Sequence, residues 1–273
     1  MDIAGVCEKI PGMEIKFVRA FADNYIWLIC HEGRVAVVDP GDTTPVLDYL
    51  RQSGDLLTAI LITHHHGDHT GGVDGLLAHR SVPVFGPAAE NIAYVDHPLH
   101  PLSGTETIDL PGIPLRLRVL DVAGHTRGHI AYYAADYHPN LLFSGDTLFV
   151  LGCGRLFEGT PERMQSSLAT LRALPDDTLV YSTHEYAVYN LAFALGVEPG
   201  NPRLQQRAEQ LRSAISTGTP TVPARLEDEK ATNPFLRWDS AEVIASASAR
   251  DQALDQKKPD CVFGTLRAWR NEF

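Results

Sequence analysis

The sequence is poor in cysteine and has no long apolar run. Its four cysteines form no CxxC pair and no tight cluster, which argues against a disulfide framework and favours reduced thiols in the cytoplasm. They are Cys7, Cys30, Cys153 and Cys261. No stretch approaches the roughly 18 apolar residues of a membrane span, and the first residues do not follow the pattern of a signal peptide. We therefore expect a cytoplasmic protein with no membrane partner.

Positive charge is also scarce. Lys and Arg number 23 against 34 Asp and Glu, so the formal net charge is −11. An acidic surface argues against nucleic acid or an anionic membrane as the main partner. It does not exclude a small anionic ligand, because metal ions or arginines can make a cleft locally positive. With 273 residues, 44% of them hydrophobic, the chain can bury a sizeable core.

The order of apolar and turn-forming segments predicts a mixed α/β domain over residues 1–185 and a small helical domain over 186–273. Expected strands are 15–20, 25–30, 35–38, 59–62, 115–122, 140–143 and 179–182, with helices at 44–51 and after Thr160. Helices are also expected from Asn201, over 240–250 and over 260–270, with a proline-containing connection at 218–229.

A histidine-rich turn follows the predicted strand 59–62 directly. In this turn, His64 and His66 can converge on one side of an extended loop, while Asp68 and His69 turn to another side. One loop can thus supply ligands to two neighbouring cations, and imidazole and carboxylate suit zinc, iron or manganese. The alternative is a solvated histidine-rich loop. His65 lies between two candidate ligands, His64 and His66, and is expected to point away from the metals.

Three further strand ends offer ligands: His125, Asp146 and His184. Each residue alone is weak evidence. Together with the turn they complete two ligand sets, because sites on sheets with helical cover gather at strand ends. Asp146 has two carboxylate oxygens and can bridge two ions. His129 competes with His125, and we expect it to pack or to support a ligand.

These residues, in this order, resemble the metallo-β-lactamase superfamily, and other segments resemble its glyoxalase II (hydroxyacylglutathione hydrolase) family. The supporting segments are 23–25, 37–40, 145–149, 152–155, 184–186, 197–201, 220–223, 233–237 and 266–273. The resemblance implies an αββα sandwich with metals at one edge of the two sheets and a small helical C-terminal domain that closes the substrate cleft.

The resemblance also implies two divalent metal ions per chain, with zinc preferred and iron or manganese as alternatives. In that case the first ion is held by His64, His66 and His125, the second by Asp68, His69 and His184, and Asp146 bridges them. Asp68 and Asp146 are accordingly the expected catalytic carboxylates.

Substrate contacts are implied for five residues: Arg155, Phe157, Tyr186, Arg267 and Arg270. Two of them depart from the family pattern. Arg270 stands where the family has Lys, and these two side chains are not interchangeable at a specific contact. Phe157 stands where members often have Tyr, which removes one hydroxyl.

The implied function is hydrolysis of S-(2-hydroxyacyl)glutathione thioesters by a metal-bridged hydroxide. S-D-lactoylglutathione would give D-lactate and glutathione in methylglyoxal detoxification, by a monomer or weak homo-oligomer. Three alternatives stay open: a one-iron persulfide dioxygenase, a β-lactamase-type hydrolase, and a metal-binding module without catalysis.

Overall fold

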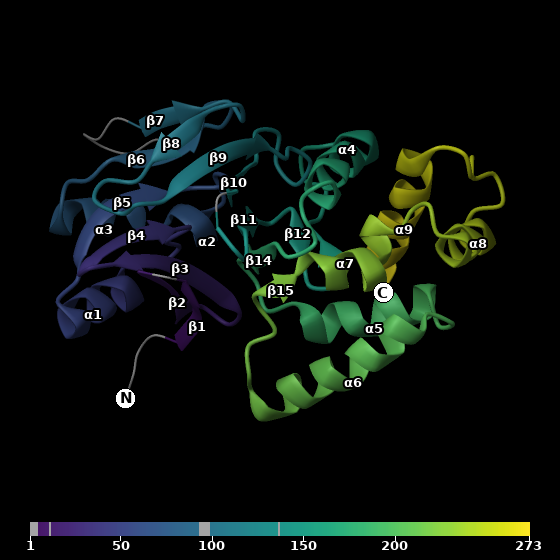
Figure 1. The fold of residues 1–273 in the computed structure, drawn as a ribbon. Coiled ribbons are helices and arrows are strands. Elements are labelled where there is room, and N and C mark those ends of the chain that lie inside the picture. Colours follow the sequence, from purple (N-terminus) through teal and green to yellow (C-terminus); the bar gives the residue numbers. More distant parts are fainter. Residues whose placement is uncertain (1–4, 11, 93–98, 136) are drawn as a thin grey trace.

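Two sheets face each other in the computed structural model, which describes residues 5–10, 12–92, 99–135 and 137–273 (Figure 1). The first sheet runs in the order β1 (Gly5–Ile10), β2 (Met13–Ala20), β3 (Asn24–His31), β4 (Arg34–Val38), β5 (Leu56–Leu61), β6 (Val84–Pro87) and β7 (Leu99–Leu102). The second runs β15 (Ala224–Arg225), β14 (Leu179–Ser182), β11 (Leu141–Gly145), β10 (Ile130–Ala134), β9 (Arg116–Asp121) and β8 (Thr107–Asp109). A short hairpin joins β12 (Leu148–Phe149) to β13 (Gly152–Cys153).

Side-chain alternation along the strands produces the layers. In β3, Tyr25 and Trp27 pack between the two sheets, while Ile26 and Leu28 join the core on the opposite face. Successive side chains of a strand point to opposite faces, so a strand buried on both faces reads as one apolar run. Helices α1 (Thr43–Ser53) and α3 (Val73–His79) cover the outer face of the first sheet. The expected αββα sandwich is confirmed.

The later helices pack around the second sheet (Figure 1). They are α4 (Pro161–Arg172), α5 (Ala187–Val197), α6 (Pro202–Thr217), α7 (Leu226–Thr232), the 3₁₀ turn Pro234–Leu236, α8 (Ala241–Arg250) and α9 (Pro259–Glu272). Most of them join the core on the outer face of the sheet, while α6 contributes Leu204, Ala208 and Leu211 to the core between the sheets. Asn201 starts α6 by accepting hydrogen bonds from the N–H groups of Arg203 and Leu204, and Pro202 suits the first helical position. The helical character expected after residue 185 is confirmed.

The segment 218–229 differs from the expected connection. Its second half forms β15 on the edge of β14, and α7 starts at Leu226. Leu226 is fully buried, and Glu227 and Asp228 lie in the first turn, where carboxylates are favoured by the helix dipole. Helix α5 was not predicted, because its own residues are mostly apolar on every side and therefore show no amphipathic period.

Backbone hydrogen bonds join the two sheets at one edge. The Tyr25 N–H donates to the Thr183 carbonyl (2.7 Å) and the Glu185 N–H to the Asp23 carbonyl (3.0 Å). Asn24 and His184 form the bridge pair between them. The start of β3 and the end of β14 are thereby held side by side.

Within the described residues, no helix combines the length and the apolarity that crossing a membrane requires. Cys30, Cys153 and Cys261 are free thiols, and the Cys7 side chain falls outside the described part of the chain.

Candidate metal centre and substrate cavity

The histidine-rich turn is anchored by Asp39, which follows β4. Its carboxylate accepts hydrogen bonds from the Thr63 N–H (2.8 Å) and the Thr63 hydroxyl (2.7 Å). The same carboxylate lies 3.0 Å from His69 Nδ1, so the other ring nitrogen of His69 is free to face the centre. Asp39 itself adopts φ of 50°, a conformation that Asp tolerates better than most residues.

A first group of three nitrogens converges beside this turn. His66 Nδ1 lies 3.0 Å from His64 Nε2 and 3.1 Å from His125 Nε2. The second nitrogen of His125 faces the Arg155 carbonyl at 2.8 Å, which orients the ring. Three imidazole nitrogens at this spacing can bind one cation.

A second group consists of Asp68, His69 and His184. Asp68 Oδ2 lies 3.4 Å from His184 Nε2 and 3.5 Å from His69 Nε2. The Asp23 carboxylate, 2.8 Å from His184 Nδ1, holds that ring as Asp39 holds His69. Pairing of a ligand histidine with an outer carboxylate is usual at metal sites, because it fixes the tautomer and the ring orientation.

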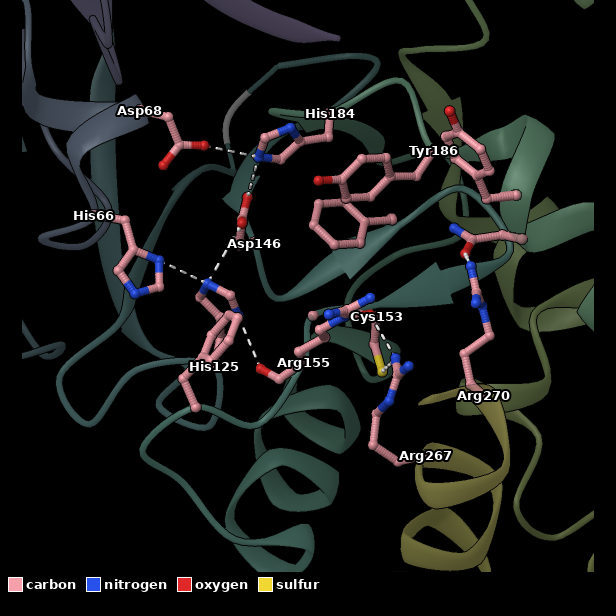
Figure 2. Close-up of a pocket in the computed structure, with 15 residues that line it drawn as sticks. His66, Asp68, His125, Asp146, Cys153, Arg155, His184, Tyr186, Arg267 and Arg270 are labelled. Atoms are coloured by element: carbon pink, nitrogen blue, oxygen red, sulfur yellow. Dashed lines mark hydrogen bonds and ion pairs between the residues drawn. The ribbon is translucent and has the colours of Figure 1, made fainter. Parts of the chain in front are cut away.

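Asp146, after β11, lies between the two groups (Figure 2). Its Oδ2 is 3.4 Å from His125 Nε2 in the first group. Its Oδ1 is 3.4 Å from His184 Nε2 and 3.5 Å from His69 Nε2 in the second. One carboxylate thus faces both groups with different oxygens.

Two buried atoms at the centre, His69 Nε2 and Asp146 Oδ1, have only the long ion-pair contacts given above and no hydrogen bond among the described residues. An unpaired buried polar atom is costly, so such atoms call for a ligand. The donor set of imidazoles and carboxylates, with convergent lone pairs, fits two divalent cations.

Electrostatics divide the ligands of the metal-free protein into two kinds. Burial, reinforced by His69 and His129, lowers the pKa of His64 well below its ordinary value. Burial also disfavours charge on His69 and His184, but the neighbouring carboxylates, Asp146 foremost, together outweigh it and raise their pKa to about 10 and about 11. Although burial acts against ionisation of Asp146, these two histidines lower its pKa. Cations therefore already balance the carboxylates where metals would bind.

His129 supports a ligand without facing the centre. Its Nε2 accepts the Asp146 N–H at 3.0 Å, and its ring stacks on His64 with centroids 4.6 Å apart. The expected supporting role of His129 agrees with this placement. The supporting carboxylates Asp23 and Asp39 were not predicted from the sequence, where they enter only within the segments 23–25 and 37–40; for Asp39, its position directly after a buried strand was an available signal.

A cavity of about 650 Å³ opens from this centre. At its far end it is lined by residues of β13, α5 and α9, including Cys153, Tyr189 and Asn190. All five residues expected to contact substrate line the same cavity: Arg155, Phe157, Tyr186, Arg267 and Arg270.

The two arginines of α9 lie one helical turn apart and point toward the cavity (Figure 2). Arg267 is 5% exposed and donates to the Cys153 carbonyl (3.0 Å) and to Asn271 Oδ1 (3.0 Å). Arg270 donates to Asn190 Oδ1 at 3.4 Å. The Nε atoms of both arginines are buried and form no hydrogen bond with the residues that the structure describes.

Neither Arg267, Arg270 nor Arg155 forms an ion pair with an acidic residue in the described part of the chain. Burial and the neighbouring charges of Arg267 and Arg155 lower the pKa of Arg270. Cations crowded together in this way, without carboxylates, form a site suited to an anionic ligand.

Aromatic residues line the passage between the two ends. Tyr186 stacks on His184 with centroids 4.6 Å apart and planes within 6°. Phe157 is 62% exposed and sets its edge against His66 and His125, at 5.5 and 5.2 Å. Burial raises the pKa of the Cys153 thiol, so this thiol is a poor nucleophile.

The fold and the paired donor groups define a metal-dependent hydrolase, and the fold and family agree with comparison to known proteins. Residues 21–184 match the family model described as the metallo-beta-lactamase superfamily, and residues 185–273 match that of the hydroxyacylglutathione hydrolase C-terminus. Among solved structures, ETHE1 from Myxococcus xanthus is 23% identical with a TM-score of 0.57, covering 93% of this chain and 97% of that one, which shows the fold alone.

Relatives of higher sequence identity show to which family within this superfamily the chain belongs. A protein of Alkalilimnicola ehrlichii named hydroxyacylglutathione hydrolase is 54% identical over 95% of this chain and 99% of its own length. Another of that name, from Nitrosomonas eutropha, is 46% identical over 94% and 97%. The chain belongs to the hydroxyacylglutathione hydrolase family.

Proposed function

We propose that this protein hydrolyses the thioester of S-(2-hydroxyacyl)glutathione, with S-D-lactoylglutathione giving D-lactate and glutathione. One observation carries the proposal: a single cavity is lined by two sets of metal donors and by three arginines that form no ion pair within the described residues. The names of the relatives at 54% and 46% identity support the same reaction.

The seven donors are assigned as the two ligand sets. His64, His66 and His125 would hold one ion, Asp68, His69 and His184 the other, and Asp146 would bridge them. When bound, the two ions supply a hydroxide nucleophile near neutral pH and stabilise the developing oxyanion.

The protein's own residues hold this arrangement and orient the substrate. Asp146 fixes the spacing of the two groups, while Asp68 contributes charge to the second. Arg155, Arg267 and Arg270 bind the carboxylates of glutathione, which brings the thioester toward the metal end. The departing thiol has an ordinary pKa of about 8.5, so it leaves readily as thiolate without an acid.

The proposal also covers the metal, the two units of the chain, the cellular compartment and the oligomeric state. Zinc is the favoured metal, because imidazole and carboxylate donors suit it. The catalytic unit is 1–185 and the substrate-binding unit 186–273. The reduced thiols Cys30, Cys153 and Cys261 fit a cytoplasmic enzyme, acting as a monomer or weak homo-oligomer.

The test is release of thiol from S-D-lactoylglutathione, before and after removal of metal by a chelator and again after zinc is restored. We expect activity that disappears and returns. Oxygen uptake with glutathione persulfide as substrate, measured in parallel, distinguishes a persulfide dioxygenase from a thioester hydrolase. A zinc-loaded protein that released no thiol but cleaved a lactam, or consumed oxygen, would contradict the proposal.

A further inference from the structure

Glu90 is a buried carboxylate outside the cavity lining. It follows β6, and its side chain is only 1% exposed. A buried carboxylate without partners is strongly unfavourable, yet Glu90 forms no ion pair with Lys or Arg among the described residues. Its hydrogen bonds must therefore offset the cost of burial.

Four donors surround this carboxylate, two at each oxygen. Oε2 accepts from the His65 N–H at 2.6 Å and lies 2.9 Å from His65 Nδ1. Oε1 accepts from the Gly128 N–H at 3.0 Å and from the Thr126 hydroxyl. Hydrogen bonds to an ionised acceptor are about twice as strong as neutral ones.

The two oxygens reach two different loops. His65 lies between the ligands His64 and His66, while Thr126 directly follows the ligand His125. These three ligands form the whole first group of nitrogens. Glu90 thus ties the loop that carries two of them to the loop that carries the third.

The chain around Gly128 allows this close approach. A Cβ added at Gly128 would lie 2.6 Å from Glu90 Cγ and 3.0 Å from the Ala89 carbonyl carbon. The second contact is to backbone, which cannot move away as a flexible side chain can. A side chain at position 128 would push the Glu90 segment off the His125 loop.

The second ligand group is supported by other residues. Asp39 holds His69, Asp23 holds His184, and Asn24 donates to Asp68 at 3.2 Å. None of the hydrogen bonds of Glu90 reaches this group.

We propose that Glu90 is a positioning residue that holds the two loops of the first metal ion in register, and that it acts on the first ion selectively. The inference rests on the proposed two-metal function and assigns Glu90 no contact with metal or substrate. Outer partners of metal ligands typically change metal affinity by 10- to 100-fold.

The experiment is titration of zinc into metal-free Glu90→Gln against a competing chelator. Gln turns one accepting oxygen into a donor, so one of the two loops loses its bonds. We expect about tenfold or greater loss of affinity for one ion and less than about threefold for the other. Cobalt loaded to one equivalent should give the visible spectrum of His66→Ala, which retains only the second group, and not that of Asp68→Asn.

The matched control is Glu229→Gln. Glu229 is equally buried, pairs with Arg207, and accepts from the Leu151 N–H and Asn233 Nδ2, both at 2.9 Å; none of these partners is a candidate metal ligand. It should lower the unfolding temperature without changing either zinc affinity. If Glu90→Gln does not fold, Thr126→Val removes one bond at constant shape and should weaken the same ion by about threefold.

Unchanged affinities in the folded variant, equal loss of both ions, or a cobalt spectrum matching Asp68→Asn would overturn the role of Glu90. If any of these results is obtained and the wild-type protein still binds two ions, the role of Glu90 is wrong but the proposed function stands. A wild-type protein that binds no pair of ions overturns both.

Discussion

The two ends of the cavity are built in opposite ways. At the metal end, the donors come from loops after strands of both sheets and from the short helix α2 (Gly67–Thr70), which carries Asp68 and His69. Outer groups such as Asp39 and Asp23 hold the rings of His69 and His184. At the cationic end, two arginines project from the single helix α9, and Arg270 has one long hydrogen bond of 3.4 Å to Asn190.

This difference indicates that the metal end holds its side chains in fixed positions, while the cationic end serves to bind the ligand. The metal end is held by strand ends and paired buried groups, which suits chemistry that depends on sub-ångström placement. The cationic end keeps unpaired charge available and can adjust to the ligand. Changes at the first should therefore affect turnover, and changes at the second should affect binding.

The largest expected effect comes from Asp146→Ala. Loss of the carboxylate that faces both groups should lower kcat/KM by about a thousandfold and reduce bound zinc below two per chain. Thiol release and elemental analysis measure this. Asp74→Ala, exposed in the first turn of α3, is the control and should change neither. If Asp146→Ala retained both ions and full activity, Asp146 would not be a metal ligand.

Acidity should act on the metal end alone. In the metal-free protein His69 and His184, with pKa about 10 and about 11, hold protons at pH 7 that zinc must displace. Lower pH strengthens proton competition, so the combined affinity for two zinc ions should fall about a hundredfold per pH unit from pH 9 to 6. Zinc titrations at fixed chelator measure the slope; a flat profile would contradict it.

The cationic end should respond through KM. Arg270→Ala removes one charged donor and should raise KM for S-D-lactoylglutathione by about tenfold, with kcat within about threefold. Arg270→Lys should recover part of the loss. Arg203→Ala, a 54% exposed arginine of α6, is the matched control. If kcat falls and KM stays constant, Arg270 belongs with the metal end instead.

The smallest effect is expected where the two ends meet. Phe157→Tyr adds a hydroxyl at the rim and should lower KM by about threefold, the value of one hydrogen bond. Phe273→Tyr, 58% exposed and outside the cavity lining, controls for added polarity. Identical KM values for both variants would mean that the rim ring makes no polar contact with substrate.

The metal end could be predicted from sequence to a degree that the cationic end could not. Metal ligands on one loop must follow short fixed spacings, so His64 to His69 form a readable pattern. Strand ends placed His125, Asp146 and His184 by the same logic. The arginines of α9 follow no such rule, and only the resemblance to a family pointed to them.

The fold shows the same limit. Most strands with strong apolar runs were predicted, although β10 was not. Helices α5 and α7 were not predicted either, because tertiary burial rather than amphipathic period determines them. Glu90 was missed entirely. A single acid in a loop gives no signal, and only its burial between two loops reveals a role.

The backbone bonds that join Tyr25 to Thr183 and Glu185 to Asp23 have a consequence for motion. They lock the two sheets together beside His184, so thermal opening of the sandwich at this edge requires the breaking of main-chain pairs. Amide protons of Tyr25 and Glu185 should accordingly exchange with solvent as slowly as the core.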